Sequence, residues 1–419
     1  MKILHVGYSD LAGGGNIAAY RIHRALVDEG HRSKMIVARK LSTDKSVLTK
    51  GLFRFDRWRK IIFRVEKILQ RVRFGIEASK LSHDTFGINL AKVAKQFNAD
   101  IVNLHWTHNS FVALKSICQV KVPVVWTFHD MLMFTGGCHY TDGCRNFERR
   151  CGCCPLLSVK ANANDVSRRN MILKERFLER KPDAIVAPSL WMKDEVKASS
   201  LFGKRRVECI PYCLADHWFD ALDRDAIRRE IGIPDGTLAI LFASNSGAAD
   251  KRKGFDLLDE ALKVMRSRWP EMKLVVLVVG GEKQDSNTAE SIQNGIPHFQ
   301  LGKLAAEADM RKVYACADVF VAPSREDNLP LVAIESLASG TPVVAFRIGG
   351  FPDLVSDSTL GYLAKPFDFV ELATGIATTA NSCSDERRVR IRQLAQAQFS
   401  STLIAERYFR LYSSILAPN

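Results

Sequence analysis

Short runs of apolar residues alternate along this chain with longer stretches in which apolar positions recur every three or four residues. Residues 2–7 show the first pattern, and residues 16–29, which end before Gly30, show the second. A short apolar run is typical of a buried strand, and the three-to-four spacing is typical of a helix with one face on the core. A glycine just after such a stretch is a common helix end. The order strand, helix, strand predicts a parallel, doubly wound α/β sheet.

The same rhythm occurs twice. Further apolar runs lie at 34–38, 101–105, 123–128 and 184–187, and then at 207–210, 238–244, 273–280, 318–322 and 342–346. Residues 254–265 have the apolar spacing of one helix face. We therefore expect two Rossmann-like domains of similar size, over residues 1–205 and 206–398. A ligand is expected in a cleft between them, at the carboxyl ends of the strands.

Charge and cysteine content narrow the chemistry. The 419 residues carry a formal net charge of +14, which attracts nucleic acid, anionic lipid or phosphorylated substrates. The apolar runs are too short to span a bilayer, and the first residues lack a signal-peptide pattern. We therefore expect a cytoplasmic protein, whose ten cysteines are thiols or metal ligands rather than disulfides.

The most specific motif covers residues 323–330 (PSREDNLP) and continues to Glu335 and residues 339–344 (SGTPVV). It reads as a strand, a loop and a helix that begins near Pro330. The unpaired N–H groups of a helix start suit a diphosphate. Asp327 and Glu335 flank that place, and carboxylates accept hydrogen bonds from the diols of ribose and sugars. The alternative is an ordinary helix cap with a solvated acid.

Residues 323–346 resemble the donor-binding signature of the retaining glycosyltransferases of the GT-B fold, family 4. That signature is a carboxylate, seven residues, then Glu, followed by a small-residue helix, Gly, Thr-Pro and a strand. The resemblance implies that Glu335 binds the ribose and that Asp327 takes the first carboxylate position, with Asn328, Leu329 and Pro330 completing the donor site. The Asp-Asn-Leu-Pro version is similar to a branch that includes colanic-acid and other exopolysaccharide transferases. A C-terminal helix over 399–419 is then expected to pack back on the N-terminal domain.

Residues 250–256 (DKRKGFD) place three consecutive cations at the start of a predicted helix. Such cations add charge to the backbone donors of a phosphate site. The family has a Lys and an Arg on the donor diphosphate here. Lys253 matches that Lys, and Arg252 is assigned to the Arg, although the family's Arg stands several residues earlier. The alternative is a solvated charge run.

Two motifs of the first half are expected at the same cleft. Residues 13–15 are three glycines between the first strand and the first helix, which lets a ligand approach the backbone closely. The last glycine of a dinucleotide fingerprint is missing, which disfavours NAD. By resemblance, Gly14 and Gly15 lie by the donor phosphates. His129, at the end of a strand in residues 126–130 (WTFHD), is expected to contact the transferred sugar. The alternatives are a tight turn and a structural histidine.

Four cysteines lie close together in an insertion over residues 135–157: Cys138, Cys144, Cys151 and Cys154. Their number suits a tetrahedral structural zinc site, although the spacing is not that of a standard zinc ribbon. Buried thiols are the alternative. In either case we expect the insertion to shape the acceptor side and to perform no chemistry.

Residues 53–74 combine an apolar helical face with a stripe of cations. The apolar positions are Trp58, Ile61, Ile62, Val65, Ile68, Leu69 and Val72, and the cations are Arg57, Lys60, Arg64, Lys67 and Arg71. This pattern is typical of a helix at an anionic membrane surface. The alternative is a core helix with a basic outer face.

The resemblance implies a retaining transfer of a hexose-type sugar from a UDP- or GDP-sugar. The cations at the expected phosphate site predict that this transfer needs no metal ion. The expected acceptor is a lipid-linked glycan. The reaction is expected to belong to the synthesis of a bacterial surface polysaccharide and to take place at the inner face of the cytoplasmic membrane. A nucleotide-sugar epimerase or a sugar-phosphate transferase is an alternative. A nucleic-acid-binding protein with a four-cysteine zinc module is disfavoured, because the aromatic-and-basic strand pattern of RNA binders is missing.

Overall fold

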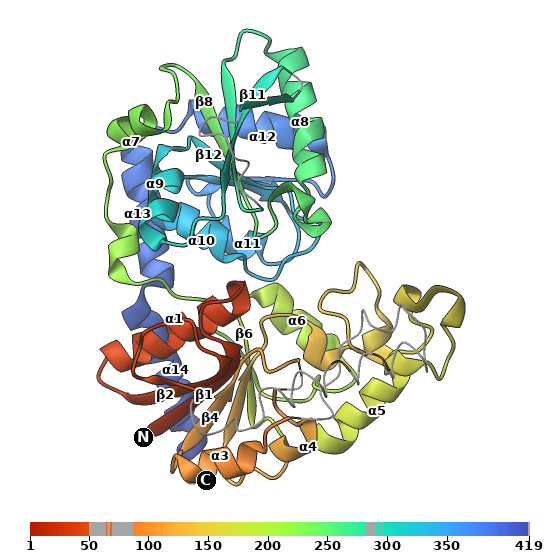
Figure 1. Ribbon diagram of the computed structural model, residues 1–419. Coiled ribbons are helices and arrows are strands. Elements are labelled where there is room, and N and C mark those ends of the chain that lie inside the picture. Colours follow the sequence, from red (N-terminus) through yellow and green to blue (C-terminus); the bar gives the residue numbers. More distant parts are fainter. Residues whose placement is uncertain are drawn as a thin grey trace. The chain divides into compact units, whose positions relative to one another are not determined.

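The computed structural model describes residues 1–49, 64, 68, 87–109, 111–281, 290–293 and 295–417. The chain forms two compact units (Figure 1). Unit 1 comprises Met1–Cys213 and Ile404–Asn419, and unit 2 comprises Leu214–Leu403. The first boundary thus lies eight residues after the one suggested by the hydrophobic pattern, and the chain returns to unit 1 at Ile404.

Unit 1 is built on a seven-stranded parallel sheet in the order β3-β2-β1-β4-β5-β6-β7. Its strands are β1 (Lys2–Ser9), β2 (Arg32–Arg39), β3 (Val47–Leu48), β4 (Ile101–Leu104), β5 (Val124–Thr127), β6 (Ala184–Ala187) and β7 (Val207–Cys209). The chain order reverses between β1 and β4, which is the place where open parallel sheets bind ligands beyond their strand ends.

The helices described in unit 1 include α1 (Gly14–Asp28), α3 (Leu90–Gln96), α4 (Leu114–Ile117), α5 (Val166–Leu178) and α6 (Leu190–Ala198), with 3₁₀ turns η2 (Leu132–Phe134), η3 (Asn146–Arg149) and η4 (Pro155–Lys160). Among these helices, α1 packs on β1 and β2, and α6 packs on β6 and β7. Polar caps define several starts: the side chain of Asp165 accepts from the N–H groups of Ser167 and Arg168 at the start of α5. Such caps satisfy N–H groups that have no partner within the helix.

The last helix, α14 (Ser401–Leu416), joins the core of unit 1 through two buried tyrosines. Asn103 Nδ2 donates to the Tyr412 hydroxyl at 2.6 Å, and the hydroxyls of Thr127 and Tyr408 lie 3.2 Å apart. Asn103 belongs to β4 and Thr127 to β5, so the end of the chain is tied to the middle of the first sheet.

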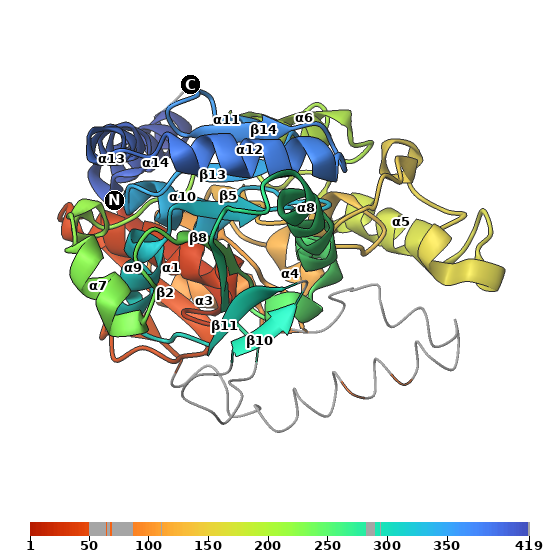
Figure 2. The ribbon, with the colours of Figure 1, turned by 90° about the horizontal axis from the view of Figure 1, so that it is seen from above.

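Unit 2 has a second seven-stranded sheet in the order β10-β11-β9-β8-β12-β13-β14. The strands are β8 (Leu238–Ala243), β9 (Leu274–Val279), β10 (Glu290–Gln293), β11 (Ile296–Gly302), β12 (Val319–Ala322), β13 (Val343–Phe346) and β14 (Gly361–Ala364). All neighbours are parallel except β10 and β11, which lie side by side at one edge (Figure 2). The sequence pattern did not predict this antiparallel edge strand.

The helices of unit 2 are α7 (Arg224–Ile231), α8 (Phe255–Arg268), α9 (Glu307–Cys316), α10 (Leu331–Ala338), α11 (Phe351–Leu354), α12 (Phe369–Asn381) and α13 (Asp385–Phe399), with 3₁₀ turns η5 (Asp216–Phe219), η6 (Gly247–Ala249) and η7 (Lys251–Lys253). On the expected apolar face of α8, Leu258, Leu262 and Met265 are fully buried, and Leu257 is half-buried. This face shares one core cluster with α12 and the central strands.

The basic helix predicted over residues 53–74 lies outside the described residues, apart from Arg64 and Ile68. Among the helices of the described ranges, none has the length and apolar character needed to cross a bilayer.

Candidate functional site

The three consecutive cations Lys251, Arg252 and Lys253 form a separate 3₁₀ turn, η7, directly before α8. We expected them on the first turn of a helix, but Gly254 separates the turn from α8 with φ of 74°. A Cβ atom at Gly254 would lie 2.0 Å from the carbonyl oxygen of Pro323. Glycine is required here because any side chain would collide with that backbone. This close approach presses η7 against the loop that follows β12.

The side chains of Lys253 and Arg252 in η7 meet the side chain of Asp327 in that loop. Lys253 Nζ donates to Asp327 Oδ2 at 2.6 Å, and the nearest guanidinium nitrogen of Arg252 lies 3.3 Å from the same oxygen. The Asp327 side chain is only 6% exposed. Burial by itself raises the pKa of Asp327, but the two cations outweigh burial and hold that pKa below its usual value. Three residues predicted separately from sequence are therefore one cation–carboxylate cluster, which we call the donor cluster.

The loop around the donor cluster is held from both sides. Arg325 donates its backbone N–H to the carbonyl of Arg252 and its guanidinium to the carbonyl of Lys251, and it pairs with both oxygens of Asp256. Gly350 N–H donates to the Asp327 carbonyl. A bidentate Arg–carboxylate pair has a fixed geometry, so Arg325 orients η7 against the loop. Sequence reasoning missed this role of Arg325.

Glu335 lies in the second turn of α10 and is 7% exposed. The Tyr314 hydroxyl donates to Glu335 Oε2 at 3.1 Å. Asn328, Leu329 and Pro330, which lead into the helix, are also buried. Asp327 and Glu335 thus flank the start of α10, whose N–H groups are suited to an anion. The sequence carried no signal for Tyr314.

In unit 1, the glycine loop lies against His129. Gly13 has φ of 87°, and α1 begins at Gly14. A Cβ atom at Gly15 would lie 3.0 Å from the His129 Cβ. Gly14 has open space around its Cα. The structure therefore brings together Gly15 and His129, which the sequence placed at the ends of two different strands.

Both ring nitrogens of His129 have partners inside unit 1. Nε2 lies 3.1 Å from His105 Nδ1, and Nδ1 lies 3.0 Å from the Tyr212 hydroxyl. Burial lowers the pKa of His129 to about 4, so the ring is neutral near pH 7. A sugar hydroxyl that bonds this ring must replace one of these two partners.

Asp130, the neighbour of His129, is engaged elsewhere. It accepts hydrogen bonds from the His139 ring at 2.7 Å, from Trp106 Nε1 at 3.0 Å and from the Leu132 N–H. The carboxylate therefore ties the loops after β4 and β5 to the cysteine-rich segment.

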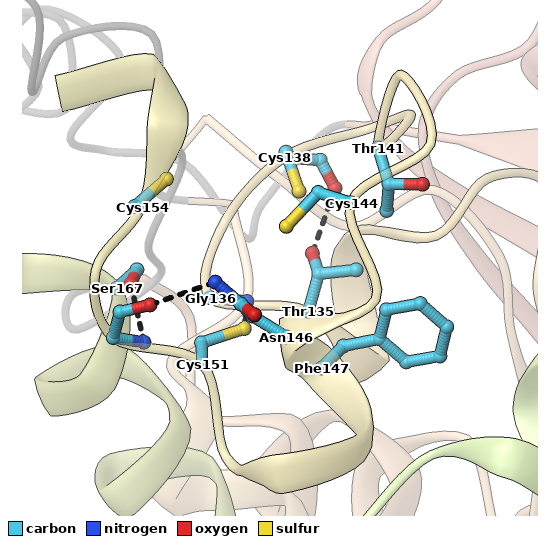
Figure 3. Close-up of a pocket in the computed structure, with 11 residues that line it drawn as sticks. Thr135, Gly136, Cys138, Thr141, Cys144, Asn146, Phe147, Cys151, Cys154 and Ser167 are labelled. Atoms are coloured by element: carbon cyan, nitrogen blue, oxygen red, sulfur yellow. Dashed lines mark hydrogen bonds between the residues drawn. The ribbon is translucent and has the colours of Figure 1, made fainter. Parts of the chain in front are cut away.

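The four cysteines of the insertion line one pocket, together with Thr135, Asn146, Phe147 and Ser167 (Figure 3). Gly136 N–H donates to Cys151 Sγ at 3.1 Å. Burial raises the pKa of Cys138 to about 11 and that of Cys151 to about 12, so both are neutral thiols near pH 7. In the ranges that the structure describes, no three His, Cys, Asp or Glu side chains are grouped so as to hold a metal ion. The structural zinc therefore stays a prediction.

Comparison with known protein families gives two matches. Residues 12–214 match the model described as Glycosyltransferase Family 4. Residues 237–382 match the model described as Glycosyl transferases group 1. The second match contains the whole donor cluster, and the first contains Gly14, Gly15 and His129.

Among curated relatives, D-inositol 3-phosphate glycosyltransferase of Corynebacterium efficiens is 33% identical over 195 residues, which are 44% of this chain and 45% of that protein. The match thus spans less than half of the relative's length. Among solved structures, sucrose-phosphate synthase from Thermosynechococcus elongatus has a TM-score of 0.66 at 18% identity, covering 99% of each chain. HepE of Anabaena in complex with UDP has a TM-score of 0.61 at 16% identity, covering 99% of this chain and 100% of its own. The two α/β units have the GT-B fold, and each of the two glycosyltransferase models matches one part of the chain.

Proposed function

We propose that this protein transfers a sugar from a nucleoside diphosphate sugar to an acceptor, with the donor bound in unit 2. The observation that carries the proposal is the donor cluster, in which Lys253 and Arg252 converge on one buried carboxylate beside the start of α10. Two cations and a helix start suit a diphosphate. The UDP in the related fold of HepE supports a nucleotide donor.

The proposed chemistry is cleavage of the bond between the anomeric carbon and the diphosphate. Negative charge grows on the leaving phosphate, and Lys253 and Arg252 stabilise that charge. Asp327 accepts hydrogen bonds from hydroxyls of the transferred sugar, and Glu335 from the ribose. We propose that the two cations do this without a catalytic divalent metal ion and that the anomeric configuration is retained.

The acceptor is proposed to be a lipid-linked glycan of a bacterial surface polysaccharide, reached at the inner face of the cytoplasmic membrane. The similarity of the Asp-Asn-Leu-Pro motif to the exopolysaccharide branch supports this choice. The relative that acts on D-inositol 3-phosphate favours a second candidate, a phosphorylated polyol. Transfer assays with a polyprenyl-diphosphate glycan and with inositol 3-phosphate as acceptors separate the two.

The proposal is tested by Lys253→Ala. We expect transfer to fall about 100-fold or more, which is typical for loss of one group that stabilises transition-state charge, with the melting temperature little changed. Lys263→Ala is the matched control, because Lys263 lies on α8 and pairs with Glu260 and Asp259 on the helix surface. Wild-type turnover in the Lys253 variant would overturn the proposal.

The donor is identified by thermal shift with UDP-, GDP- and dTDP-sugars. A ligand that binds only the folded protein raises its stability by about 2.7 kcal/mol at 100 times its Kd. We expect one nucleotide class to raise the melting temperature of the wild type and to do so much less in the Lys253→Ala variant. Transfer should also persist in excess EDTA.

A further inference from the structure

Three buried histidines of unit 1 form a continuous row of hydrogen bonds that ends at His129. His5 Nδ1 lies 2.9 Å from His105 Nε2, and His105 Nδ1 lies 3.1 Å from His129 Nε2. The exposed fractions of the three residues are 0%, 1% and 8%. We call His5, His105 and His129 the histidine chain.

The sheet explains why the rings line up. His5 is on β1, His105 directly follows β4, and His129 is the second residue after β5. These strands are parallel neighbours, in which His5 lies opposite Asn103 and Leu104 lies opposite Trp126. Each histidine is therefore two residues beyond the position paired with the previous one. A shift of two residues keeps the side chains on the same face of the sheet, so the row crosses the strands diagonally. The ring centroids are 5.2 Å apart between His5 and His105 and 5.3 Å apart between His105 and His129.

The direction of the hydrogen bonds follows from counting protons. Burial holds the pKa of His5 and His105 well below the usual value and lowers that of His129 to about 4, so each ring has one N–H and one acceptor nitrogen. All protons must then point the same way along the row. In the described part of the chain, His5 Nε2 has no hydrogen-bond partner. If the protons point from His129 towards His5, a buried N–H is left at His5 Nε2. If they point from His5 towards His129, only a lone pair is left there.

A buried N–H without an acceptor is the rarer situation in native proteins. The favoured direction therefore has His5 Nδ1–H donating to His105 and His105 Nδ1–H donating to His129 Nε2. The remaining proton of His129 is on Nδ1, which donates to the Tyr212 oxygen.

We infer that His105 and His5 are positioning residues that hold His129 neutral, in one orientation, with its proton on Nδ1. This inference rests on the proposed function for its purpose: the ring becomes a fixed N–H donor, suited to the oxygen of a sugar hydroxyl that takes the place of Tyr212. His23 is not part of the histidine chain, because its ring nitrogens lie 2.7 Å from the Ser33 hydroxyl and 2.8 Å from the Ser46 hydroxyl.

The tautomer of His129 tests the inference directly. The 419-residue chain contains ten histidines, which can be labelled with ¹⁵N, and His129→Asn identifies the signals of His129. At neutral pH we expect the wild type to carry its proton on Nδ1. A proton on Nε2 would overturn the inference, and this measurement needs no other variant to fold.

Variants of His105 test the link. In His105→Phe, the proton of His129 should no longer be confined to Nδ1. His105→Gln keeps a donor and an acceptor, so the proton of His129 should stay on Nδ1. His23→Phe is the control for removal of a buried imidazole and should leave the His129 tautomer unchanged. An unchanged tautomer in His105→Phe, or an equal change in His23→Phe, would contradict the inference.

Sugar transfer gives a second readout. His105→Phe should lower kcat about tenfold, the effect of one lost hydrogen bond, while UDP affinity, which depends on unit 2, stays the same. His105→Gln should restore most of kcat. The NMR result does not depend on sugar transfer, so failure of the tautomer inference and failure of the proposed function are observed separately.

Discussion

At the scale of single residues, the donor cluster shows one carboxylate holding two cations. Asp327 is buried, and its charge is balanced by Lys253 and Arg252. A phosphate that binds the same cations must compete with this carboxylate. Asp327 is therefore expected to weaken the binding of the bare nucleotide while it supports the sugar.

Asp327→Asn should separate these two effects. Removing the negative charge frees both cations, so we expect UDP to bind about tenfold more tightly, or ~1.4 kcal/mol. Transfer should fall about 100-fold, because the hydroxyl acceptor is weaker. Calorimetry with UDP and a transfer assay measure the two quantities. Asp225→Asn, which removes an exposed carboxylate of α7, serves as the control and should leave both quantities unchanged. Parallel losses of affinity and transfer would contradict the argument.

At the scale of elements, the donor cluster exists because η7 touches the loop after β12. Gly254 permits that contact, since a Cβ atom there would lie 2.0 Å from the Pro323 oxygen. Gly232, which ends α7, has φ of 84° but nothing within 4 Å of an added Cβ. The two glycines share a left-handed backbone and differ in the space around them.

Gly254→Ala should therefore destabilise unit 2 more than Gly232→Ala does. We expect about 1 kcal/mol for Gly232→Ala, from the left-handed backbone alone, and ~3 kcal/mol or more for Gly254→Ala, where the backbone must also move. Urea unfolding measures both values. Only Gly254→Ala should also weaken UDP binding. Equal costs would show that the contact with Pro323 is not tight.

The cysteine-rich insertion carries a separate prediction. Its motif predicts about one zinc ion per chain, although the described thiols are not grouped as ligands. Elemental analysis of protein purified under reducing conditions should find the metal in the wild type and in Cys118→Ser, since Cys118 is exposed and outside the pocket. The metal should be lost in Cys151→Ser. A zinc-free wild type would instead establish the four cysteines as buried thiols.

At the scale of the whole molecule, burial of several histidines makes stability depend on pH. The pKa values of His23 and His129 are lowered to about 4, and those of His5 and His105 are held well below the usual value, mainly because burial removes water from the rings. The unfolded chain therefore binds more protons than the folded chain between about pH 6.5 and pH 4. Stability is retained above pH 6.5 and lost as the pH falls through this window.

As the pH falls through that window, protonation of each of these histidines in the unfolded chain should lower the free energy of unfolding by about 1.4 kcal/mol per pH unit. Urea unfolding at pH values between 7 and 5 measures the slope for unit 1. His23→Gln removes one titrating group and should reduce the slope by that amount. An identical slope in the variant would mean that His23 is not buried in its neutral form.

The sequence by itself was enough to predict features that depend on neighbouring residues. Apolar periodicity predicted two α/β units because a strand or helix buries residues at a fixed spacing. The resemblance of short motifs predicted Lys253, Asp327 and Glu335 as site residues, and this assignment stays a prediction. An antiparallel edge strand such as β10 left no signal, because four residues are too few to show a pattern.

Only the tertiary structure decided which distant residues meet. His5 joins His105 because β1 pairs with β4, Tyr314 reaches Glu335 from the preceding helix, and Tyr412 returns to Asn103 across more than 300 residues of chain. These contacts depend on strand order and helix packing, which no local spacing encodes. For the same reason, the spacing of the four cysteines did not reveal that they line one pocket.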